Sequence, residues 1–176
     1  KVIALLKLNN VKMQQLASDT KLDLDMYYIG DMKTSTRPYE GHYQHSAVNV
    51  NTVNQNIQFY EGDYVVYVNQ PNNRYIVETL EPQAVDSFFN WNFFDSILGQ
   101  KEGYSSYVFE DTAAELLKKD PDLRKKLEEE KTKNADLAKT GRMQLDFVYK
   151  NSAYFEKTTM RYPIGRLMKN TSLNLK

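Results

Sequence analysis

The density of charged side chains changes sharply along this chain of 176 residues. Residues 34–92 contain eight charged side chains, whereas the shorter stretch 101–133 contains seventeen, of which eight are basic and nine acidic. Sparse charge among many Tyr, Val, Asn and Gln residues is typical of strands and turns, and dense charge of both signs is typical of helix surfaces. The change falls near residues 99–103. It predicts a chain that is mainly β over residues 1–98 and mainly α over residues 99–176.

Alternating apolar residues predict strands in the first half of the chain. One run recurs at every second position, which is the period of a half-buried strand: Leu22, Leu24, Met26 and Tyr28. Turn residues at 18–20 predict that residues 11–17 and 22–29 form a hairpin. Residues 47–53 alternate again, and residues 64–68 are apolar on both faces, which predicts a strand in the centre of a sheet. We therefore expect an antiparallel β-sandwich of jelly-roll type.

Residues 70–94 leave two alternatives open. Pro71 suits the first turn of a helix, with Asn69 as a cap and Pro82 as a stop. The β-branched pair Ile76 and Val77 after a tyrosine favours a strand instead. Both a helix and a strand are compatible with this segment.

The second half of the chain carries helix signals. Thr112 and Glu115 have the spacing of a capping box, which predicts that a helix begins there. Asp120 before Pro121 predicts a second helix start, with the aspartate as cap and the proline in the first turn. Residues 145–149 predict a further short amphipathic helix. The expected fold class is thus α+β, a single accessory domain in which the sandwich packs against a set of short helices.

Composition excludes several classes of function. The 23 basic and 23 acidic side chains cancel, and the isoelectric point is about 6.9, so the chain lacks the basic excess of a nucleic-acid-binding protein. No apolar run approaches the roughly 18–20 residues that cross a bilayer, so we expect no membrane span. The absence of cysteine removes disulfides and thiolate metal sites, and leaves the cellular compartment undetermined.

The candidate metal ligands are Glu40, His42 and His45, which include both histidines of the chain. Catalytic zinc requires three protein ligands around an open position. Residues three apart on a strand point to opposite faces, so the two imidazoles converge only in a turn or a helix. The alternative is a pair of hydrogen-bonded histidines at a junction of loop and sheet. Because phosphate loops, His-Glu-x-x-His helices and nucleophile elbows are missing from the sequence, we expect no catalytic residue and no cofactor in this chain.

Residues 88–94 contain five aromatic side chains, and Trp91 is the only tryptophan. One interpretation is a core seam that joins the β half to the helical half. The other is a platform for a carbohydrate or a peptide, which requires an exposed Trp91. The exposure of this side chain distinguishes the two interpretations.

Eight short motifs follow one another over most of the chain. They are PYEGHY at 38–43, GDYVV at 62–66, NQP at 69–71, LEP at 80–82, DSF at 86–88, WNFFD at 91–95, YVFED at 107–111 and RYP at 161–163. In this order they resemble the C-terminal region of large bacterial zinc carboxypeptidases of the carboxypeptidase A-like type. The family's catalytic His-x-x-Glu pair is not found here, because His42 is followed at the Glu position by His45, and His45 by Val48.

The resemblance implies a non-catalytic C-terminal accessory domain of a zinc carboxypeptidase. Its partner would be an upstream peptidase domain of the same polypeptide, which would hold the zinc ion. The accessory domain would pack against that peptidase domain or shape the access of substrate to it. Residues 1–7 fit the last turns of a helix that enters from upstream, so we expect this chain to be a piece of a longer protein. A secreted or periplasmic location of that longer protein is compatible with the sequence. The alternative function is a stand-alone β-sandwich module that binds a glycan or a peptide.

Overall fold

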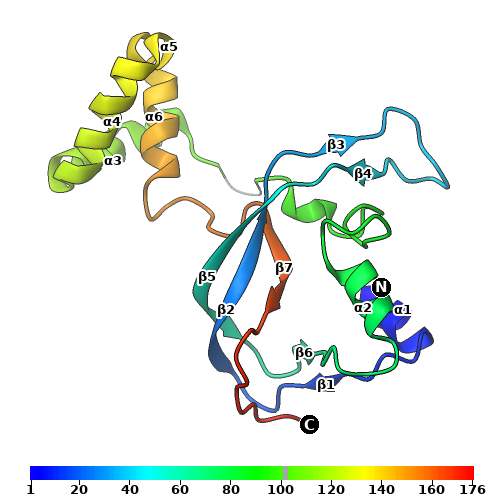
Figure 1. Ribbon diagram of the computed structural model, residues 1–176. Helices are drawn as coiled ribbons and strands as arrows, with labels where there is room; N and C mark the ends of the chain where they lie inside the picture. The colour runs from blue at the N-terminus through cyan, green and yellow to red at the C-terminus, as the bar shows by residue number, and fades with distance from the viewer. Residues whose placement is uncertain (101–102) are drawn as a thin grey trace. The chain divides into compact units, whose positions relative to one another are not determined.

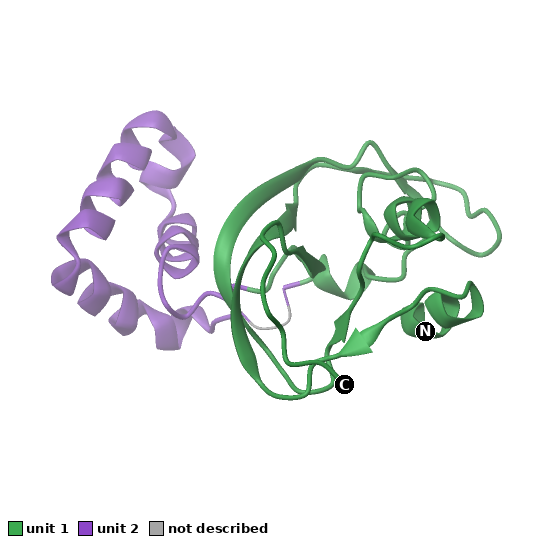
Figure 2. Cartoon of the chain, turned by 60° about the horizontal axis from the view of Figure 1, so that its bottom comes forward, with its two compact units in different colours: residues 1–99, 158–176 green, residues 100–157 purple. Residues whose placement is uncertain are grey.

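The computed structural model describes residues 1–100 and 103–176 and divides the chain into two compact units. Unit 1 contains residues 1–99 and 158–176, and unit 2 contains residues 100–157 (Figure 2). The change in charge density therefore coincides with the first boundary between the units. The predicted α half does not extend to the C-terminus, because residues 158–176 return to unit 1 and contribute a strand to its sheet.

Unit 1 is built around a three-stranded antiparallel sheet (Figure 1). Its order is β5 (Val50–Phe59), β2 (Thr20–Ile29) and β7 (Arg161–Arg166). Two small antiparallel sheets accompany it: β1 (Gln14–Gln15) with β6 (Tyr64–Val65), and β3 (Lys33–Thr34) with β4 (His45–Ser46). Helices and antiparallel sheets together confirm the α+β class. This strand order does not confirm the predicted jelly-roll sandwich.

The apolar alternation places β2 in the centre of the sheet. Leu24 and Met26 are buried, as the period-two pattern requires. The pairing with β7 shifts register between Met26 and Tyr28, and after the shift Tyr27 and Ile29 are the buried residues. Tyr28 stays on the face of Leu24 and Met26, where its hydroxyl donates a hydrogen bond of 3.1 Å to Gln55 Oε1, but it is only half-buried.

Two strand predictions are wrong. Residues 11–17 do not form a hairpin with β2, because β1 pairs with β6 and β2 pairs over its whole length with β5. Residues 64–68 are not a central strand, because only Tyr64 and Val65 pair, and Tyr67 and Val68 are about half exposed. The apolar pattern of a segment does not show which strand it pairs with or whether it lies at the centre or the edge of a sheet. Both predictions failed because they assumed the partner strand.

The segment 70–94 begins with a helix. Helix α2 (Asn73–Leu80) has Asn72 at its N-terminal flank instead of the predicted Asn69. Helix α1 (Val2–Leu8) confirms the helical reading of the first residues. Together they bury an apolar cluster: Leu6, Val11, Ile76 and Phe88. A single 3-10 turn, η1 (Asp95–Ile97), follows the aromatic segment.

A second cluster lies against the sheet and includes Phe89 and Tyr162, each of them fully buried. The hydroxyl of Tyr162 donates a hydrogen bond of 2.9 Å to the carbonyl of Leu80, which satisfies its one polar atom. Burial raises the pKa of Tyr162 because ionisation there would leave a charge in apolar surroundings. The RYP motif thus places a structural tyrosine in the core of unit 1.

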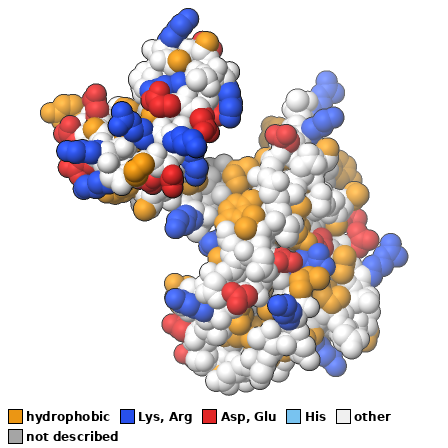
Figure 3. Space-filling model, turned by 60° about the vertical axis from the view of Figure 1, so that its left-hand side comes forward, with side chains coloured by type: hydrophobic (Ala, Val, Ile, Leu, Met, Phe, Trp, Pro, Cys, Tyr) orange, Lys and Arg blue, Asp and Glu red, His pale blue; other side chains and the backbone are white. Residues whose placement is uncertain are grey.

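The described residues of unit 2 form four helices: α3 (Ser106–Lys119), α4 (Pro121–Lys133), α5 (Ala135–Lys139) and α6 (Gly141–Lys150). Asp120 caps α4 as predicted, since its Oδ1 accepts a hydrogen bond of 2.9 Å from the Leu123 amide. The Thr112 capping box is wrong, because α3 already begins at Ser106. Lysine, arginine and carboxylate side chains crowd the outer surface of these helices (Figure 3), as the charge density indicates.

In the part of the chain that the structure describes, every helix falls short of the length and apolar character that crossing a membrane requires.

A glycine on β7 gives a test of this packing. A Cβ at Gly165 would overlap Leu24 Cδ1 and come within 2.7 Å of Met26 Sδ, and both neighbours are buried. We expect Gly165→Ala to lower the free energy of unfolding of unit 1 by about 1–3 kcal/mol, the usual cost of overpacking. Urea unfolding followed by Trp91 fluorescence measures it. Gly141→Ala is the control, because nothing lies within 4 Å of that position; equal stability of the two variants would contradict the packing.

Candidate functional site

A tight hairpin turn presents one side of the candidate site. Between β3 and β4, Tyr39 and His42 exchange backbone hydrogen bonds of 2.9 and 2.8 Å. The two residues between them have positive φ angles, +49° at Glu40 and +80° at Gly41, which is the geometry of a type I′ turn. The Glu-Gly pair therefore makes Tyr39 and His42 a directly opposed cross-strand pair, whose side chains are neighbours.

The aromatic segment presents the other side. Phe88 and Phe89 are buried in different clusters, which fixes the backbone immediately before Trp91. The Asn90 carbonyl accepts a hydrogen bond of 2.9 Å from the His45 amide. The Asn92 side chain donates to the Tyr43 carbonyl at 2.9 Å. These bonds tie the segment to the hairpin on both sides of Trp91.

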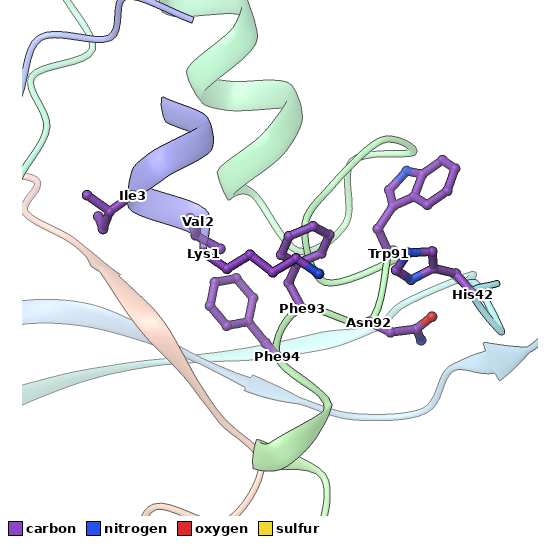
Figure 4. A pocket seen from close by; sticks show the side chains of 8 residues that line it. All are labelled: Lys1, Val2, Ile3, His42, Trp91, Asn92, Phe93 and Phe94. Carbon is purple, nitrogen blue, oxygen red and sulfur yellow. The ribbon is translucent and has the colours of Figure 1, made fainter. Parts of the chain in front are cut away.

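Between the hairpin turn and the aromatic segment is an open pocket of about 490 Å³ (Figure 4), within the range of small-molecule sites. It is lined by eight residues: Lys1, Val2, Ile3, His42, Trp91, Asn92, Phe93 and Phe94. The His42 ring is parallel to Phe93, with centroids 6.2 Å apart, and is nearly perpendicular to Trp91, with centroids 5.5 Å apart. The Lys1 ammonium lies 4.7 Å from the centre of the Phe93 ring. Tyr39 extends the aromatic surface, since its ring lies 6.1 Å from Trp91.

Polar groups of this pocket are available to a ligand. Within residues 1–100 and 103–176, no hydrogen bond is found for the indole N–H of Trp91 or the ring nitrogens of His42, and no ion pair for Lys1. The pocket thus combines aromatic faces with a neutral donor, an imidazole and a cation. Such a set binds molecules that have both an apolar face and hydrogen-bonding groups.

His45 has a different environment. Its side chain is buried, with Nδ1 2.9 Å from the Thr34 hydroxyl and Nε2 3.0 Å from Asp95 Oδ1. The ring also lies against Phe89, at 5.1 Å between centroids. These contacts connect β3, β4 and η1, which is the arrangement of a hydrogen-bonded histidine at a junction of loop and sheet.

The three candidate metal ligands are not brought together. Glu40 is exposed at the turn, His42 faces the aromatic pocket, and His45 is buried with Thr34 and Asp95. Across the described ranges, no group of three or more His, Asp or Glu side chains has the spacing to hold a metal ion. The residues present therefore do not fit a zinc site, and the zinc that the family resemblance implies stays a prediction for a domain upstream.

The sequence identified Trp91 as the candidate ligand-binding residue, and the structure places it half-buried on the pocket wall. Its neighbours Phe88 and Phe89 are core residues, so the segment divides between the two predicted roles. The described members of both clusters all belong to unit 1, and the seam with the helices of unit 2 stays a prediction.

The predicted aromatic platform at residues 88–94 includes Phe93, whereas Lys1 and Tyr39 were missed as parts of the site. A Glu-Gly pair between an aromatic residue and a histidine indicates a tight hairpin, and that signal could have found Tyr39.

Comparisons of this chain with protein-family models, with curated proteins and with solved structures found no significant match.

Alanine substitutions separate the core residue from the pocket residue. We expect Phe89→Ala to lower the free energy of unfolding by about 3–5 kcal/mol, because it leaves a cavity in a closed core. Trp91→Ala should cost clearly less, since part of the indole faces the open pocket. Urea unfolding followed by circular dichroism measures both. An equal loss in the two variants would show that Trp91 is a core residue.

Proposed function

We propose that unit 1 is a non-catalytic module that binds a glycan in the pocket between the Glu40–Gly41 turn and the aromatic segment. The observation that carries the proposal is the wall formed by Trp91, His42 and Phe93, which joins aromatic surface to unpaired hydrogen-bonding groups. The sequence alone is compatible with either a glycan or a peptide as the ligand of such a module. The pocket favours the glycan for reasons of shape and charge.

A sugar ring has one face of C–H groups and a rim of hydroxyl groups. The C–H face packs against an aromatic ring, and the hydroxyl groups take the donors and acceptors around it. Trp91 supplies both the surface and an indole N–H, and the imidazole of His42 adds one donor and one acceptor when neutral. A charged peptide segment would instead require paired charges, and Lys1 is the one charged side chain among the residues that line the pocket.

The role beside a peptidase domain remains a second proposal, supported by the family resemblance. Several residues that carry the resemblance have structural roles: Gly62 adopts φ +90° in a turn, and Pro82, Phe88 and Tyr162 are buried. Residues of this kind preserve a fold and perform no chemistry, as a non-catalytic accessory domain requires. A glycan-binding module attached to a zinc carboxypeptidase would direct that enzyme to its substrate.

The glycan proposal is tested by titrating the chain with neutral sugars while recording Trp91 fluorescence. Glucose, galactose, N-acetylglucosamine and their β-linked disaccharides are suitable probes. We expect at least one to bind saturably and to shift the emission, because Trp91 is the only tryptophan and lines the pocket. Binding measured by calorimetry should weaken at least tenfold in Trp91→Ala, equivalent to about 1.4 kcal/mol. His42→Ala should weaken it as well.

Tyr107→Ala is the matched control, because Tyr107 is an aromatic residue that is 89% exposed on α3. It should leave sugar affinity unchanged. If no probe binds, or if Trp91→Ala binds as well as the unmodified chain, the glycan proposal fails while the accessory-domain proposal is unaffected.

A further inference from the structure

Strand β5 is a long edge strand without the usual protection. It has ten residues, VNTVNQNIQF, and in the described part of the chain it pairs with β2 alone (Figure 1). The strand contains no charged residue, no proline and no glycine. Natural edge strands are normally blocked by such residues, because unpaired backbone groups otherwise pair with another strand. An edge of this kind is suited to a partner.

The register shows which backbone groups face outward. Ile29 of β2 donates its amide to the Met160 carbonyl, on the side of β7. The direction of the backbone N–H and C=O groups alternates along an antiparallel strand, so these groups of the even-numbered residues of β2 point toward β5. These are paired with odd-numbered residues of β5, from Ile57 opposite Leu22 to Asn51 opposite Tyr28. The N–H and C=O groups that point away from the sheet therefore belong to Val50, Thr52, Asn54, Asn56 and Gln58.

We propose that β5 pairs with β5 of a second copy of this chain, antiparallel, about a two-fold axis at Asn54. This register sets Asn54 opposite Asn54, Thr52 opposite Asn56 and Val50 opposite Gln58. Every outward N–H and C=O of the strand then has a partner. The three-stranded sheets of the two copies join into one of six strands, in the order β7-β2-β5-β5-β2-β7.

The side chains favour a copy of the same chain. Pairing β5 with itself brings no like charges together, because the strand is uncharged. The nearest carboxylates, Asp23 and Asp25 on β2, already accept hydrogen bonds of 2.7 and 2.8 Å from the side chains of Asn56 and Asn54. These amides are held over β2, so they do not obstruct the outward edge.

Cysteine cross-linking tests the register, because the chain has no cysteine of its own. In Asn54→Cys the two thiols lie opposite each other, with Cα atoms about 5.5 Å apart, which is within reach of a disulfide. In Thr52→Cys the corresponding residues are offset by four positions, roughly 13 Å along the strand. We expect mild oxidation to give a covalent dimer for Asn54→Cys and none for Thr52→Cys. Equal cross-linking of both variants would overturn the register.

Sedimentation velocity over a range of concentrations tests the association itself. The unmodified chain should form dimers, and Asn54→Pro should remain monomeric, because proline removes the central outward N–H. Asn54→Thr is the matched control: it loses the same side-chain bond to Asp25 but keeps the N–H, and should still dimerise. A monomeric unmodified chain at every concentration would overturn the proposal. The cross-linking result decides the matter independently if Asn54→Pro does not fold.

Discussion

The burial of Phe88 and Phe89 in two different cores is the constraint on which the rest of unit 1 depends. Phe88 joins Leu6 and Ile76 beneath the helices, whereas Phe89 joins Tyr162 against the sheet. Two neighbouring side chains that are both removed from water leave the backbone between them little freedom. The segment that follows, with Trp91, is therefore held in position by hydrophobic burial and not by a regular element.

Hydrogen bonds then convert this position into a site. The amide of His45 and the carbonyl of Tyr43 both bond to the aromatic segment, through Asn90 and Asn92 respectively. The buried ring of His45 holds the same region through Thr34 and Asp95. His45 thus stabilises the hairpin through its buried hydrogen bonds, while His42, three residues earlier, faces the pocket. His42 lies at the turn and His45 lies in β4, so the two histidines have separate roles.

Local signals in the sequence identified several elements correctly. The alternation from Leu22 to Met26 predicted β2, and Asp120 with Pro121 predicted the start of α4, because both depend on residues close in sequence. The pairing of strands could not be predicted in the same way. Residues 14–15 bond to β6 across some fifty residues of chain, and β7 comes from beyond unit 2, where an apolar pattern carries no information about its partner.

By itself the sequence determined the α+β class, the division of the chain near residue 99, the Asp120 cap of α4 and the strand character of β2, since each follows from composition or from near neighbours. Only the tertiary structure decided that Trp91 lines a pocket while Phe89 is buried, and that β5 is an edge strand. The physical reason is that exposure depends on which distant segments pack together. Aromatic residues of one short run, such as Phe89 and Trp91, therefore differ in burial because different distant segments pack against them.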